Sequence, residues 1–169
     1  MQGKAKRVKA TDLLELLREF HRDKLGLYQR HVAAARAVGN YDFNNTYQYI
    51  IAREDMHVSW VADAIADMGG QLDTVAEPAI SAAGKGDARQ ASVITQDRDG
   101  AGEFLAKWRP RVEKMTHARH RTMLEVILGE TVEHKRFFEQ ALAGRADLLG
   151  RRADGAGTPG VVMSTRWVE

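Results

Sequence analysis

Residues 50–65 read IIAREDMHVSWVADAI, and they place a carboxylate and an imidazole on the predicted apolar face of one helix. Glu54 and His57 lie three residues apart and therefore share one side of that helix. An ionised carboxylate is costly to bury unless an opposite charge pairs with it, and a metal ion would supply such a charge. Helical spacing predicts a buried stripe made of Tyr47, Ile50, Glu54, His57, Val61, Ala64 and Ile65.

The composition indicates one compact domain, because 169 residues with 44% apolar content can bury a single sizeable core. The formal net charge is only +2, so we expect no nucleic-acid partner. A small basic cluster lies at Lys4, Lys6, Arg7 and Lys9 and is typical of a solvated arm. No apolar run is long enough to span a membrane and no signal peptide is visible, so we expect no membrane partner and a cytoplasmic location.

The chain contains no cysteine, which excludes disulfides, thiolate metal sites and cysteine nucleophiles. Any metal would therefore be held by carboxylate and imidazole groups. These ligands suit iron, manganese or zinc.

The first half of the sequence predicts a helical hairpin. Thr11 and Asp12 are suitable residues to start a helix over 12–38, which Gly39 would end. Residues 40–45 (NYDFNN) have the composition of a turn, and a second helix is predicted over 46–68. The short connection makes the two helices antiparallel neighbours.

Residues 69–100 are rich in glycine and small polar residues and predict a long crossover, with a helical turn or two around 88–93. Helical spacing resumes at Phe104. Pro110 would mark a kink or the first turn of a separate piece, and residues 123–142 form another regular helical stretch.

An internal repeat indicates how the second half is organised. Shifting the chain by 77 residues aligns His57 with His134, and this alignment predicts a turn near Thr116. The predicted fold is an all-α, antiparallel four-helix bundle with one long crossover. We expect a basic arm at 1–11, the bundle at 12–143 and a tail at 144–169 that docks on the body or on a neighbouring subunit, with a flexible terminus as the alternative.

This order of helices and motifs resembles the ferritin-like superfamily, in particular its rubrerythrin and bacterioferritin branch. The resemblance covers roughly residues 12–143, and REDMHVSWVADAIADMGG at 53–70 is the closest local match. It implies a centre of two metals, to which two helices each contribute a Glu and the other two each contribute a Glu-x-x-His motif.

Carried over by position, the resemblance assigns Glu54 and His57 to one complete motif. In the last helix His134 is present, but Thr131 stands where the family has Glu, and Glu130 is a substitute one residue earlier. The single-Glu position of the first helix is His21. On the third helix that position is about Arg98, with three nearby acids as candidates: Asp97, Asp99 and Glu103. The predicted metal ligands are His21, Glu54, His57, Glu130 and His134.

Three functions are compatible with these residues. The first is a ferritin-like metal-binding protein with a single or incomplete di-metal site of iron, or of manganese or zinc, in a redox or metal-handling role. Tyr28 or Tyr47 would then serve as a hydrogen-bond donor or electron source. The second is a metal-free bundle that acts as a structural or interaction module, with Glu54 and His57 in a buried hydrogen-bonded cluster with His21, His134 and a Tyr. The third is a binding protein for a small organic ligand. We expect a homo-oligomer, a dimer or larger, and assign no catalytic residue.

Overall fold

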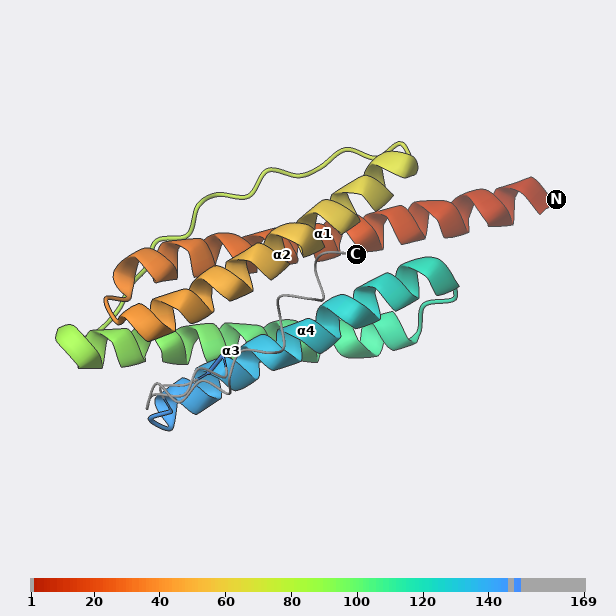
Figure 1. Ribbon diagram of the computed structural model, residues 1–169. Helices are drawn as coiled ribbons and strands as arrows, with labels where there is room; N and C mark the ends of the chain where they lie inside the picture. The colour runs from red at the N-terminus through yellow and green to blue at the C-terminus, as the bar shows by residue number, and fades with distance from the viewer. Residues whose placement is uncertain (1, 146–147, 150–169) are drawn as a thin grey trace, which may run out of the picture.

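The computed structural model consists of four α-helices, α1 (Gln2–Ala37), α2 (Tyr41–Asp67), α3 (Gly86–Glu113) and α4 (Ala118–Leu142) (Figure 1). It describes the backbone of residues 2–145 and 148–149, and the side chains of 11–145 and 148–149. The predicted all-α four-helix bundle with one long crossover is confirmed. The predicted tail at 144–169 lies almost entirely outside the described residues.

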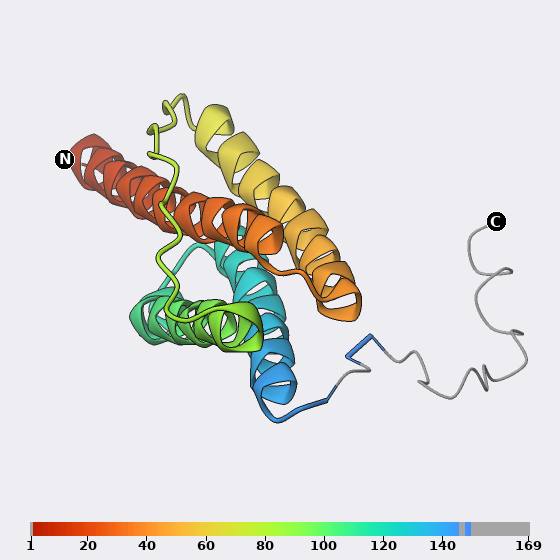
Figure 2. The ribbon, with the colours of Figure 1, turned by 90° about the vertical axis from the view of Figure 1, so that its left-hand side faces the viewer.

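The bundle is built from two helical hairpins that lie against each other as layers, α1 with α2 and α3 with α4 (Figures 1 and 2). The crossover at 68–85 runs over the outer side of α1 to reach the start of α3. Asp73 in the crossover accepts hydrogen bonds from Arg18 Nη2 at 2.6 Å and Arg22 Nη1 at 3.4 Å. These ion pairs fix the long connection to α1.

Helices α1 and α2 both begin earlier than the sequence predicts. α1 begins at Gln2 rather than at residue 12, so Thr11 and Asp12 lie inside the helix. The predicted turn at 40–45 was wrong, because α2 begins at Tyr41. Asn40 is the cap: its Oδ1 accepts a hydrogen bond from Phe43 N at 2.9 Å. The polar residues that suggested a turn therefore belong to the first turn of a helix.

The second hairpin also differs in its bounds. α3 begins at Gly86, so the crossover is shorter than the predicted 69–100, and the helical turn predicted at 88–93 is the start of α3. Pro110 lies inside α3, near its end. The predicted turn near Thr116 is confirmed, because α3 ends at Glu113 and α4 begins at Ala118.

The core has two apolar clusters with a polar layer between them. The larger cluster surrounds Phe20 and Trp108, whose ring centroids are 4.8 Å apart. The smaller one contains Phe43, Tyr47 and Phe138. Seven buried polar residues lie between or beside the positions of the two clusters along the helices, and we call this set the polar layer: Lys24, His31, Glu54, His57, Asp97, Thr131 and His134.

None of the described helices is both long and apolar enough to cross a membrane.

Candidate functional site

Helix α2 presents its polar pair, Glu54 and His57, to the core as predicted. All seven residues of the predicted α2 stripe are buried, and both Glu54 and His57 are fully enclosed. The stripe is buried because its residues recur at helical spacing on the side of α2 that faces the other helices. The question is therefore which groups surround the Glu54 carboxylate.

Glu54 is paired with two residues of α1. Lys24 Nζ donates to Glu54 Oε1 at 2.7 Å, and His31 Nδ1 lies 2.7 Å from Glu54 Oε2. Lys24 Nζ also lies 3.4 Å from Thr131 Oγ1 on α4. All four side chains are enclosed. Both carboxylate oxygens of Glu54 therefore have a partner within the protein, and one of these partners is an ammonium group.

The electrostatics of this contact favour an ionised carboxylate. Burial by itself raises the pKa of Glu54, but the neighbouring His31 and Lys24 outweigh burial and hold that pKa well below its usual value. His134, also in the polar layer, has its pKa lowered mainly by burial. The centre of the bundle thus contains a charged Glu54 beside an imidazole that resists protonation.

A second polar group lies between α2 and α4. Arg53 Nε donates to Glu130 Oε2 at 2.9 Å, and His57 Nε2 lies 2.9 Å from the same oxygen. The hydrogen bond from Arg53 lowers the pKa of Glu130, whereas burial lowers the pKa of His57 to about 4. Glu130 thus lies close to His57, as the predicted metal site requires. However, its carboxylate pairs with Arg53 and makes no hydrogen bond with Glu54.

Asp97 is the acid of α3 that faces the core. It accepts hydrogen bonds from Tyr47 Oη and, at 2.6 Å, from Arg30 Nε. Burial, followed by the charge of Asp97, raises the pKa of the Tyr47 hydroxyl. The other two candidate acids, Asp99 and Glu103, are exposed. Asp97 thus has its own donors, and Tyr47 acts as a hydrogen-bond donor within the core.

Two predicted site residues are buried but lie differently from the expectation. His134 Nδ1 is 3.6 Å from Glu54 Oε1, too long for a hydrogen bond, and neither ring nitrogen of His134 has a hydrogen-bond partner among the described residues. His21 is also buried, and its Nδ1 has no such partner. The polar groups bonded to Glu54 come from Lys24 and His31, not from His21.

Sequence reasoning missed Lys24 and His31. Both lie on the true buried stripe of α1, which repeats at alternating steps of three and four residues: Leu17, Phe20, Lys24, Leu27, His31, Ala34 and Val38. Such a stripe is the signature of a helix packed along one seam. The signal was present, but a lysine at a seam position is usually taken for a surface residue.

The polar layer does not fit the two-metal centre that the sequence resemblance implies. The two acids of the polar layer and the neighbouring Glu130 each have a cation: Lys24 with Glu54, Arg30 with Asp97, and Arg53 with Glu130. Within the described part of the chain, no three histidine, aspartate or glutamate side chains are grouped so that they could hold a metal ion. The carboxylate charge that a metal would balance is already balanced by protein groups.

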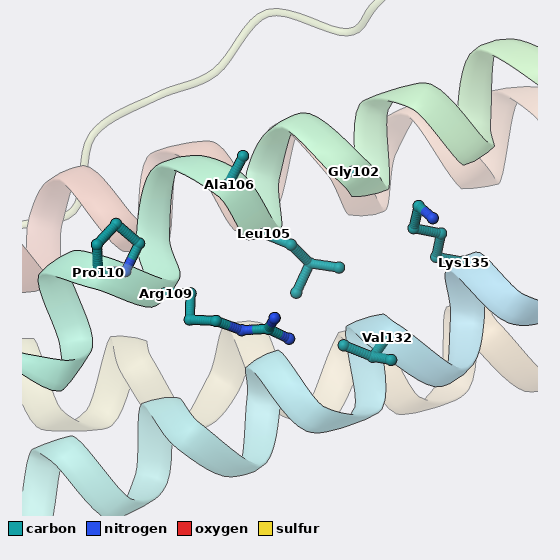
Figure 3. A pocket seen from close by; sticks show the side chains of 7 residues that line it. All are labelled: Gly102, Leu105, Ala106, Arg109, Pro110, Val132 and Lys135. Atoms are coloured by element: carbon teal, nitrogen blue, oxygen red, sulfur yellow. The ribbon is translucent and has the colours of Figure 1, made fainter.

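A groove outside the polar layer lies between α3 and α4 (Figure 3). It has a volume of about 460 Å³, and Leu105 and Val132 line it. Arg109 extends across it from α3, and Lys135 extends from α4 toward Gly102 (Figure 3). A Cβ at Gly102 would lie 3.4 Å from Lys135 Cε, so the glycine allows the lysine stem to lie close against α3. The described residues that line the groove offer cations and apolar surface but no acid.

The fold and the polar layer define an all-α protein of the four-helix-bundle class with ion pairs inside its core. Comparisons of the chain with protein-family models, with curated proteins and with solved structures found no match.

Proposed function

We propose that this protein is a metal-free bundle of the ferritin-like type that acts as an interaction module. The observation that supports the proposal most directly is the ion pair between Lys24 Nζ and Glu54 Oε1 at 2.7 Å, with both side chains fully enclosed. The lysine supplies, from within the chain, the positive charge that a buried Glu54 requires.

The charge of the site supports the same conclusion. A divalent ion bound to Glu54 would lie within a few ångströms of the Lys24 ammonium, and two like charges that close repel strongly where water is excluded. Metal binding would require Lys24 to lose its proton or move away. Thr131 weakens the case further, because a hydroxyl stands where a second carboxylate would be needed and it already donates to Ile127 O at 2.8 Å.

The partner that we propose is a second copy of this chain, bound through the outer side of α2 and α4. This α2–α4 face consists of Tyr49, Arg53, Met56, Val126 and Glu130. Tyr49, Met56 and Val126 are large apolar residues that are 38%, 43% and 45% exposed. Arg53 and Glu130 form an ion pair among them. A two-fold axis would place the Arg53 of one copy near the Glu130 of the other, so the face is self-complementary in charge.

The absence of a bound metal is tested on protein that is purified without a chelator. We expect negligible metal by elemental mass spectrometry, and a change of less than about 1 °C in the unfolding temperature on adding Fe²⁺, Mn²⁺ or Zn²⁺. Lys24→Ala is the matched variant: it removes the ammonium and leaves Glu54, His31 and His134 around the space, so Zn²⁺ should stabilise it. Bound metal in the unchanged protein, with a raised unfolding temperature, would refute the proposal.

Metal binding is the second candidate function, and one observation favours it. His134 is buried beside Glu54, and neither of its ring nitrogens has a hydrogen-bond partner in the described part of the chain, so it is available as a ligand if Lys24 moves away. In that case the protein would hold iron, manganese or zinc. Stoichiometric metal in the unchanged protein would select this candidate, and Glu54→Ala should then abolish the uptake.

The dimer is tested by sedimentation velocity over a range of protein concentrations. Met56→Glu and Val126→Glu should shift the equilibrium toward monomer, because each places a charge in the middle of the apolar face. Val132→Glu is the matched control, since Val132 is 40% exposed on the same helix but lines the groove next to α3. A protein that is monomeric at every concentration, or equal effects of all three variants, would contradict the proposed interface.

A further inference from the structure

A pocket of about 790 Å³ opens at the end of the bundle where α1, the end of α2 and the turn between α3 and α4 meet, the right-hand end in Figure 1. Its size is within the range of small-molecule sites in proteins. No residue of the polar layer is among the described residues that line it. The residues that line it are Asp12, Leu13, Leu16, Met68, Arg111, Lys114, Met115, Thr116, His117 and His120.

The inner wall of this pocket is apolar. Met115 belongs to the larger apolar cluster of the core, and Leu13, Leu16 and Met68 pack against that cluster. The pocket is therefore a place where the core is open to the surface. An apolar chain that filled it would extend the existing core and gain free energy from the surface removed from water.

The residues that line the pocket include two cations, Arg111 and Lys114, and one carboxylate. Lys114 is exposed, and the one carboxylate among the lining residues is Asp12. Arg111 is committed elsewhere, because its two Nη atoms donate to Glu19 at 2.8 and 2.7 Å. Of the two cations among the described lining residues, Lys114 is thus the one that a ligand can engage.

His120 is an unpartnered polar group in the wall of the pocket. Its side chain is nine-tenths buried, and its Nδ1 has no hydrogen-bond partner among the described residues. The ring stacks on His117 with the centroids 4.3 Å apart, and His117 Nδ1 accepts a hydrogen bond from His120 N. A buried polar atom without a partner destabilises the protein, so a ligand that bonds it gains affinity.

We propose that this pocket binds an amphiphilic monocarboxylate, of the chemical class of medium-chain fatty acids. The alkyl chain would lie against Leu13, Leu16, Met68 and Met115. The carboxylate would accept hydrogen bonds from Lys114 Nζ and from the His120 ring. This site is independent of the proposed metal-free role of the polar layer and of the α2–α4 face.

The test is a titration of full-length protein, labelled with ¹³C at its methionine methyl groups, with sodium octanoate. Met68 and Met115 should show saturable shifts, whereas Met56 on the α2–α4 face is an internal control that should not move. Octanoate should bind about tenfold more tightly than 1-octanol, and octylamine should bind more weakly than either. Lys114→Gln should abolish the preference for octanoate over octanol.

Leu13→Trp is a second variant, chosen because Leu13 is a half-buried residue of the apolar wall and its replacement fills the pocket without opening the core. It should abolish the shifts at Met68 and Met115 with the fold intact. Equal affinity for octanoate and octanol would refute the carboxylate recognition. Shifts that do not saturate, or that appear equally at Met56, would refute the pocket as a binding site.

Discussion

Lys24 of α1 and Glu54 of α2 form an ion pair in the middle of the bundle, with Nζ and Oε1 2.7 Å apart and both side chains fully enclosed. The same ammonium lies 3.4 Å from Thr131 Oγ1 on α4. One lysine thus connects three of the four helices. Because a buried charge without a partner is far costlier than a buried pair, this contact makes each residue depend on the other.

Replacing Lys24 with methionine should lower the free energy of unfolding by about 3–5 kcal/mol, because it leaves the Glu54 carboxylate buried without a cation. Urea unfolding at pH 7 measures the change. The double variant Lys24→Met with Glu54→Leu should lose less stability than the single variant, since it removes both charges. A double variant that is less stable than the single variant would contradict this prediction, because the loss would then not come from the unpaired Glu54 carboxylate.

The control for this experiment is Lys135→Met. Lys135 pairs with Glu139 on the surface of α4, where water screens both groups. The loss there should stay below about 1 kcal/mol. Similar losses for Lys24→Met and Lys135→Met would contradict the buried ion pair.

Replacing Tyr47 with phenylalanine should cost about 1–3 kcal/mol, because Asp97 then loses one of its donors inside the core and keeps only Arg30. Thermal unfolding monitored by circular dichroism measures this loss. Tyr41→Phe is the control, since Tyr41 is 73% exposed and removing its hydroxyl leaves no buried group without a hydrogen-bond partner. Equal effects of the two substitutions would mean that the contact with Asp97 contributes nothing.

The sequence predicted the fold class and the buried face of α2 well. The α2 stripe is unambiguous because its apolar residues recur at helical spacing without a gap, so Glu54 and His57 could be placed inside the core with no structure. The turn near Thr116 could be placed from the internal repeat, because two similar hairpins must turn at equivalent positions.

The face of α1 could not be fixed in the same way. Its buried stripe includes Lys24 and His31, which interrupt the apolar pattern, whereas Leu25 and Tyr28 beside them suggest a different face. A helix rotates by about 100° per residue, so a shift of one position changes which side chains point inward. Lys24 and His31 were therefore not predicted as partners of Glu54, because the wrong face of α1 was expected to be buried.

The sequence also did not decide which acid of α3 faces the core, for a related reason. α3 has a weak apolar pattern, with glycine and alanine near its centre, so periodicity alone did not distinguish Asp97 from Asp99. Its partners decide the matter: Tyr47 and Arg30 both point to Asp97. A contact of this kind joins residues far apart in the sequence and leaves no local signal.

Stability should fall as the pH is lowered through the range of histidine titration. The pKa of His57 is about 4 in the folded protein, against an ordinary value of 6.5 that applies to the unfolded chain. Between these values the unfolded chain binds more protons, so unfolding becomes easier. The stability that neutral His57 contributes is complete above pH 6.5 and is lost as the pH falls toward 4. The loss is on the order of 2 kcal/mol.

Urea midpoints measured from pH 7.5 to 4.5 test this dependence. The groups that face His57 are Glu130 and His134 on α4 and Lys24 on α1. His134 contributes with the same sign, because its pKa is also lowered. His57→Gln should flatten the curve, since glutamine does not titrate. A midpoint that is constant down to pH 4.5 would contradict the burial of a neutral His57.

The end of α2 is sensitive to a single methyl group at Gly70. A Cβ there would lie 2.5 Å from Leu14 Cδ1 and 3.2 Å from Ile65 O, and the latter accepts the hydrogen bond from Gly70 N. Leu14 can adjust its rotamer, but the carbonyl belongs to the backbone and cannot give way cheaply. Gly70→Ala should therefore lower the free energy of unfolding by about 1–3 kcal/mol.

Gly39→Ala provides the matched comparison in the connection between α1 and α2. No atom lies within 4 Å of a Cβ at Gly39, and its φ is not positive. The substitution should raise stability by about 0.4–1 kcal/mol, because alanine reduces the freedom of the unfolded chain. Urea unfolding of both variants gives opposite signs if Gly70 is held between α1 and the end of α2. A neutral or stabilising effect of Gly70→Ala would contradict the predicted clash of a Cβ at Gly70 with Leu14 and Ile65 O.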